Sequence, residues 1–186
     1  MKNILLLIGL AVLIGCNPTN APSKNSTPLS EFHPEQKIET LGITLPQPSS
    51  PVANYVRTVQ TGNLLYLSGN GPRKADGSLY VGKLGVDLNT AQGYDAARLT
   101  GINLLAVLKA ELGDLKKIKR IVKVLGMVNA SPDFTEHPQV INGFSDLMVD
   151  VFGSRGKHAR SAVGMASLPM GIAVEIELIV EIDTAR

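Results

Sequence analysis

Residues 172–182, which read IAVEIELIVEI, decide the fold of this chain. Successive side chains of a strand point to opposite faces, so Val174, Ile176 and every second residue to Ile182 share one face. Glu175, Glu177 and Glu181 share the other face. The pattern predicts a strand with one face buried in a core and one face that carries carboxylates.

Four further runs extend this strand into a sheet. Residues 55–60 and 64–68 are extended runs separated by Thr61-Gly62-Asn63, which has the length and the turn chemistry of a hairpin. Residues 118–128 are mostly apolar and β-branched, which is typical of a central strand. Residues 161–166 are predicted to form another strand.

Two amphipathic segments lie between these runs. Apolar and small residues recur at helical spacing over 90–112, before Gly113, and over 138–152, before Gly153. The order is therefore strand, strand, helix, strand, helix, strand, strand. It predicts an α+β fold in which two helices pack on one face of a single mixed sheet.

The N-terminus has the features of an export signal. Lys2 precedes an apolar run over 4–14, and Leu13-Ile14-Gly15-Cys16 resembles the bacterial lipobox. This resemblance implies that residues 1–15 are a signal peptide cleaved before a lipid-modified Cys16. The alternative for Cys16, the only cysteine, is a buried free thiol.

The following segment is rich in Pro, Ser, Thr and Asn, a composition that cannot bury enough apolar surface to order a chain. We therefore expect the lipidated Cys16 and a flexible tether over 16–44, with a short ordered lead-in near Leu41, and one domain over 45–186. The predicted location is exported and periplasm-facing. The lipid alone would anchor it, and Asn17 in place of a retention aspartate favours the outer membrane.

Composition argues against several functions. The net charge is +2 with Lys and Arg scattered along the chain, so no basic stripe for nucleic acid is predicted. His33, His137 and His158 are not paired with carboxylates at ligand spacing, so no metal site is predicted. A ribonuclease therefore ranks last among the functions considered.

Two charged residues could carry chemistry. Arg160 begins one predicted strand and Glu175 lies near the start of the next, so pairing of these strands would bring them close. Arg160 could hold a substrate carboxylate bidentately, and Glu175 could orient water or transfer a proton. The alternative is an ordinary salt bridge beside a solvated glutamate face.

A family resemblance strengthens the first interpretation. The motifs that carry it are His158-Ala159-Arg160-Ser161-Ala162-Val163, Ala166-Ser167-Leu168-Pro169, Val174-Glu175-Ile176-Glu177, Asn54-Tyr55 and the run from Val59 through Leu67-Ser68-Gly69. The chain resembles the Rid family of YjgF-like reactive intermediate deaminases from about residue 50 to 182. The resemblance implies a chorismate-mutase-like α+β fold and a homotrimer with ligand clefts between subunits.

The same resemblance implies site residues. Arg160 would grip the carboxylate of an amino-acid-derived imine or enamine, and Glu175 would activate water. Tyr55, Ser68 and Gly69 would line the cleft, although Tyr55 could be a half-buried strand aromatic and Ser68 a strand-end cap. Ala162 and His158 depart from the family pattern, which often has cysteine and proline there.

The implied reaction is hydrolysis of small carboxylated imines or enamines to 2-oxo acids and ammonia, without a cofactor. The implied activity is that of a 2-iminobutanoate/2-iminopropanoate deaminase. The alternative is a non-catalytic module that binds a small carboxylate, such as a 2-oxo acid, in the same cleft.

Overall fold

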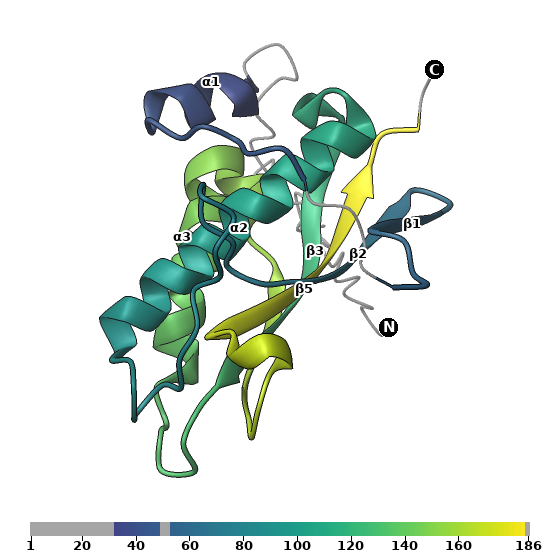
Figure 1. Cartoon of the computed structure of the whole chain (residues 1–186). Coiled ribbons are helices and arrows are strands. Elements are labelled where there is room, and N and C mark those ends of the chain that lie inside the picture. The colour runs from purple at the N-terminus through teal and green to yellow at the C-terminus, as the bar shows by residue number, and fades with distance from the viewer. Residues whose placement is uncertain (1–31, 49–52, 185–186) are drawn as a thin grey trace, which may run out of the picture.

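The computed structural model describes residues 32–48 and 53–184. A five-stranded sheet in the order β1-β2-β5-β3-β4 is backed by helices (Figure 1). The strands are β1 (Thr58–Thr61), β2 (Leu64–Asn70), β3 (Ile118–Asn129), β4 (Ala159–Met165) and β5 (Val174–Ile182). The helices are α1 (Pro34–Thr40), α2 (Thr90–Leu112) and α3 (His137–Phe152), with short 3-10 turns η2 (Leu115–Lys117), η3 (Gly153–Gly156) and η4 (Pro169–Gly171).

The glutamate-bearing strand β5 lies between β2 and β3 and is antiparallel to both. Its alternation is as predicted, because Val174, Ile176 and Leu178 are at most 1% exposed while the intervening residues are not buried. β3 and β4 are parallel, so the sheet is mixed. The predicted α+β class is confirmed.

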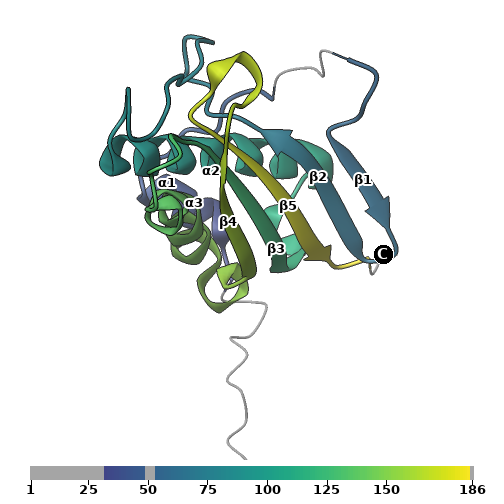
Figure 2. The same cartoon turned by 90° about the horizontal axis from the view of Figure 1, so that it is seen from below.

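Helices α2 and α3 pack side by side on one face of the sheet and leave the other face open (Figure 2). α2 begins with a capping box between Asn89 and Gln92 and ends at Gly113, whose φ of 74° suits glycine. Its small residues contact α3 as well as the sheet: a Cβ added to Gly101 would meet Leu147 at 2.8 Å. Small residues thus allow the two helices to approach closely.

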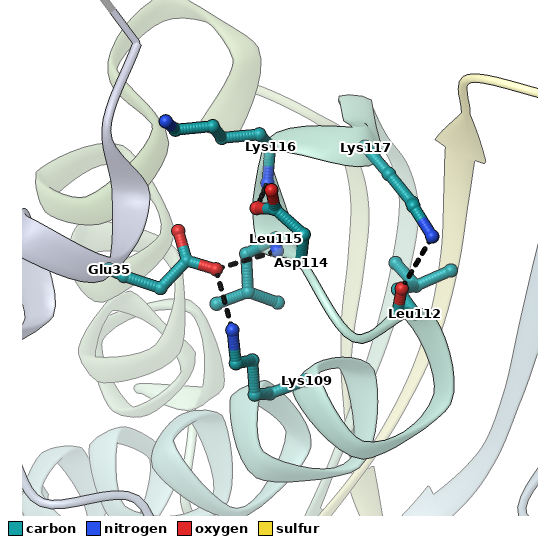
Figure 3. A network of polar contacts seen from close by, with 7 residues as sticks. All are labelled: Glu35, Lys109, Leu112, Asp114, Leu115, Lys116 and Lys117. Atoms are coloured by element: carbon teal, nitrogen blue, oxygen red, sulfur yellow. Dashed lines mark hydrogen bonds and ion pairs between the residues drawn. The ribbon is translucent and has the colours of Figure 1, made fainter. Parts of the chain in front are cut away.

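The prediction of a flexible tether reaching residue 44 is wrong for its last part. Residues 34–40 form α1, in which Pro34 and Ile38 are buried, and Ile38 joins the main core. Glu35 Oε1 accepts hydrogen bonds from Lys109 Nζ at 3.1 Å and from the Leu115 backbone N–H at 2.8 Å (Figure 3). Composition missed α1 because this short helix is stabilised by long-range contacts.

The N-terminal predictions before this helix lie outside the described residues, namely the signal peptide over 1–15 and the lipidated Cys16. Within residues 32–48 and 53–184, no helix has the length and hydropathy needed to cross a membrane.

The strands that carry Arg160 and Glu175 do not pair, so the condition under which these residues would lie close together is not met within one protomer. β4 pairs with β3, in the register Val124 to Arg160, and β3 separates it from β5. The reason is topological. β3, α3 and β4 form a strand-helix-strand crossover, which places the two strands side by side in parallel.

Candidate functional site

A cavity of about 400 Å³ opens at the β1–β2 side of the sheet. Its walls come from the segment before β1, the end of β2, the hairpin that follows β2, and one face of α2. The predicted residues Tyr55, Ser68 and Gly69 line it together with Arg57, Arg73 and Lys74. Of the five predicted site residues, Tyr55, Ser68 and Gly69 thus line one cavity within a single protomer.

Tyr55 and Ser68 differ in how freely they can meet a ligand. The Tyr55 side chain is 50% exposed at the cavity wall. The Ser68 hydroxyl donates to the carbonyl of Val56 at 2.8 Å, while the Ser68 backbone N–H donates to the carbonyl of Arg57 at 2.9 Å. Ser68 therefore ties the segment before β1 to β2, and its hydroxyl can offer a ligand only its acceptor capacity.

Glu175 lies directly against Gly69. A Cβ added to Gly69 would overlap the Glu175 carboxylate, so the side chain uses the space that only glycine leaves. Partial burial of Glu175, with the nearby charge of Glu177, raises the pKa of its carboxyl group. A carboxyl group with a raised pKa is a better proton acceptor when ionised than an ordinary one.

Arg160 is not at this cavity in the same protomer. β4 and β2 are separated by β5 and β3. Three strand spacings of roughly 4.8 Å therefore put them about 14 Å apart. Arg160 is also on the helix face, because its partner Val124 is in the core, whereas Glu175 faces the open side opposite Met127.

The Arg160 guanidinium is held by α3. Its Nη1 donates to Asn142 Oδ1 at 2.9 Å and to Ser145 Oγ at 3.0 Å. Both bonds use the same nitrogen, so within the described part of the chain Nη2 and Nε stay available. Those two nitrogens can form the parallel fork that a carboxylate accepts.

His158 completes this arrangement. Its Nδ1 lies 2.6 Å from the carbonyl of Gly156 and its Nε2 lies 3.1 Å from Ser145 Oγ. The Gly156 carbonyl can only accept, so Nδ1–H donates to it, and in the neutral ring Nε2 then accepts from the Ser145 hydroxyl. Desolvation by burial lowers the pKa of His158. The hydrogen bond to the Gly156 carbonyl partly opposes this effect, and the charge of Arg160 adds a smaller lowering.

We expect a pH-dependent loss of stability at His158. Because its pKa is lowered in the folded chain, the neutral ring is preferred there. The stability that the neutral His158 ring contributes to the folded chain is fully present above the ordinary histidine pKa of about 6.5. It is lost as the pH falls below that value and through the lower pKa of the folded state. Urea midpoints between pH 7.5 and 5.5 should fall more for the native chain than for His158→Gln. Equal slopes would contradict this assignment.

Sequence reasoning missed two pairs of residues: Asn142 and Ser145, which hold Arg160, and the cavity cations Arg73 and Lys74. Asn142 and Ser145 are three residues apart on α3, so they share a side of the helix, and this polar pair next to the apolar stripe was the available signal. Arg73 and Lys74 sit in a turn-rich segment that predicts only a loop.

The other histidines take structural positions. His33 occupies the N-cap position of α1 without a capping hydrogen bond from its side chain, and His137 is the first residue of α3, with its ring edge-on to Phe134 at 5.3 Å between centroids. Over the residues that the structure describes, no group of three or more His, Cys, Asp or Glu side chains could hold a metal ion.

Comparison with known proteins places this geometry in a family context. A family model described as "YjgF/chorismate_mutase-like, putative endoribonuclease" matches residues 35–182. Protein TCP17 of Trypanosoma cruzi is 44% identical over 147 residues, which are 78% of this chain and 92% of TCP17. A 2-iminobutanoate/2-iminopropanoate deaminase of Dermatophagoides farinae is 32% identical over 146 residues, which cover 76% of this chain and 95% of that protein.

A solved structure shows the same fold. The crystal structure of Atu1372 from Agrobacterium tumefaciens, a protein of unknown function, is 47% identical in sequence. It aligns with a TM-score of 0.76 over 81% of this chain and 92% of its own. The expected chorismate-mutase-like fold is therefore confirmed.

Proposed function

Since this chain belongs to the YjgF/chorismate mutase-like family, we propose that it is an imine and enamine deaminase that acts on small carboxylated substrates. The observation that carries the proposal is Glu175. Its carboxyl group is half-buried, has a raised pKa and lies against Gly69, a residue that lines the cavity of about 400 Å³. This is a position from which a carboxyl group can handle protons for a bound ligand.

The reaction needs little from the protein. An enamine first takes a proton at its β-carbon and becomes an imine, whose carbon is electrophilic. Glu175 orients a water molecule and accepts its proton while the oxygen bonds to that carbon. Glu175 then gives this proton to the amine of the resulting carbinolamine. As the C–N bond breaks and ammonia leaves, the hydroxyl gives its proton to Glu175 and becomes the carbonyl of a 2-oxo acid. No cofactor takes part in these steps.

We further propose that the chain works as a homotrimer in which Arg160 of one subunit completes the cavity of the next. Arg160 cannot reach the Glu175 cavity of its own protomer, but it lies on the edge strand β4 with Nη2 and Nε facing no described partner. The open sheet face exposes Tyr66, Val163 and Met165, each at least 36%, which suits burial against other subunits.

The location is part of the same proposal. The apolar run before Leu13-Ile14-Gly15-Cys16 supports signal cleavage and lipid attachment at Cys16. The lipid would anchor the trimer to the membrane, on the periplasmic side and in the outer membrane. Residues 17–31 would link Cys16 to the domain, which starts by Phe32: this ring packs on Phe152 with 6.2 Å between centroids.

We expect Arg160→Ala to lower kcat/KM for 2-oxo acid and ammonia release by about a hundredfold, because a charged anchor of the substrate is lost. The assay uses the detergent-solubilised full chain and enzymatically generated 2-iminopropanoate or 2-iminobutanoate. Arg98→Ala is the matched control, because this arginine pairs with Asp150 at 3.9 Å on the outer helix surface. It should keep native activity.

Three results would count against the proposal. Unchanged affinity of Arg160→Ala for 2-oxo acids would remove Arg160 as the anchor. Arginine-dependent binding without acceleration of any imine would instead establish the carboxylate-binding module. If the chain cleaves RNA, and Arg160→Ala and Arg98→Ala both keep this activity, the deaminase assignment is rejected.

A further inference from the structure

We propose that the substrate carries a second anionic group, of the carboxylate class, which binds to Arg73 and Lys74 at the cavity. The inference rests on the proposed deaminase function, which assigns the first carboxylate to Arg160. It names a narrower substrate class, dicarboxylic imines or enamines, for the same site.

The charge of the cavity wall is the first argument. Arg57, Arg73 and Lys74 all line it, and none of the described lining residues is Asp or Glu. Arg73 and Lys74 are neighbours in this hollow, so their like charges repel one another and an anion that joins them relieves the repulsion. A bound anion would therefore gain from their combined potential, and the cavity selects for negative charge.

The carboxylate nearest in sequence is directed elsewhere. Asp76 Oδ1 accepts hydrogen bonds from the Ser78 hydroxyl at 2.6 Å and from the Ser78 backbone N–H at 2.9 Å. These bonds, chiefly the one from the hydroxyl, lower the pKa of Asp76, and the charge of Lys74 adds a smaller lowering. Asp76 is used to close the hairpin turn and forms no salt bridge with Arg73 or Lys74 among those that the structure describes.

The position of Arg73 is fixed from both sides. Its Nη1 donates to the carbonyl of Gly77 at 2.7 Å across the hairpin, and Arg73 pairs with Leu79 in an antiparallel bridge. Asn103 of α2 donates its side-chain amide to the carbonyl of Arg73 at 3.1 Å. A guanidinium has five N–H donors, so one bond to Gly77 holds it in place and leaves most of the fork for a ligand.

Lys74 is placed beside it. Its Nζ lies 5.2 Å from the centroid of the Tyr80 ring, and its backbone N–H donates to the carbonyl of Ser78 at 2.8 Å. The ring contact holds the ammonium group without neutralising it. Arg73 can therefore supply a fork and Lys74 a point charge for the same anion.

The size of the cavity is the second argument. A volume of about 400 Å³ falls within the range of roughly 300–1,000 Å³ that drug-sized ligands occupy. An imine of three or four carbons would leave much of this space filled with water. A longer substrate with a second carboxylate would occupy it and reach the Arg73 side.

The test compares two ligands that differ only in the second carboxylate. Calorimetry on the detergent-solubilised full chain measures the affinity of 2-oxopentanedioate and of 2-oxopentanoate, which have the same carbon chain. We expect the dicarboxylate to bind at least about tenfold more tightly, because charge-assisted hydrogen bonds each contribute on that scale. Arg73→Gln with Lys74→Gln should abolish this preference and leave 2-oxopentanoate affinity unchanged.

The matched control removes the same two residue types at the far end of the sheet. Lys119 and Arg120 are exposed at the start of β3, whereas Glu175 pairs with Met127 near the end of β3. The double variant Lys119→Gln with Arg120→Gln should therefore keep the preference for the dicarboxylate. Equal binding of both ligands to the native chain overturns the inference and leaves the deaminase proposal standing. Binding of neither ligand overturns both, and a preference that survives loss of Arg73 and Lys74 overturns the assignment to them.

Discussion

Glu175→Gln should lower kcat for imine hydrolysis by roughly 10²- to 10⁴-fold, the range that loss of a general acid or base produces. The amide keeps the size of the carboxyl group, so it still fits against Gly69, but it cannot accept a proton from water. Single-turnover release of 2-oxo acid measures the chemical step directly, and calorimetry with 2-oxobutanoate measures binding. We expect affinity to stay within about threefold, because Arg160 supplies the anchor.

Glu177→Gln is the control for this variant. Glu177 is an exposed glutamate on the same strand face, two residues along β5, and its charge contributes to the raised pKa of Glu175. Its loss should leave kcat nearly unchanged and move the pH profile to slightly lower pH. A Glu175→Gln chain with native kcat would remove Glu175 from the chemistry.

Mixing two inactive chains tests whether the site is shared. If Arg160 serves the cavity of a neighbouring subunit, an Arg160→Ala chain co-assembled with a Glu175→Gln chain forms some interfaces in which both native residues meet. Random assembly predicts recovery of about a quarter of the activity in a closed symmetric ring. No recovery from verified mixed trimers would place both residues in one subunit's site.

Gly143→Ala should destabilise the fold by about 3 kcal/mol or more and lower Tm by about 10 °C, although alanine is normally the better helix former by up to about 1 kcal/mol. A Cβ at this position of α3 would overlap the backbone carbonyl of Tyr94 and lie 3.1 Å from the Arg98 nitrogen. Backbone cannot rotate away as a side chain can, so α2 and α3 would have to separate. Thermal unfolding of the full chain measures the loss.

Gln139→Ala provides the comparison on the same helix. Gln139 is exposed in the first turn of α3, so alanine there changes helix propensity without changing packing. Its Tm should stay within about 2 °C of the native value. A Gly143→Ala chain as stable as Gln139→Ala would show that the two helices are not in contact at this point.

The sequence by itself determined the elements and their faces. Alternation over 172–182 identified β5, helical spacing identified α2 and α3, and each matches the structure to within two residues at either end. Period-two and period-3.6 patterns are local records of which side chains meet the core, so they can be read without knowing the partner. The motifs around Arg160 and Glu175 also predicted the family through their order and spacing.

Tertiary structure alone decided which elements became neighbours. The crossover through α3 put β4 beside β3, and so separated Arg160 from Glu175 by strand order and by sheet face. Docking of α1 through Glu35 and Ile38 turned a segment of tether-like composition into part of the core. Glu175 of β5 came to lie against Gly69 of the neighbouring strand β2. Such contacts join residues distant in sequence, and the free energy that selects them comes from packing that no local pattern encodes.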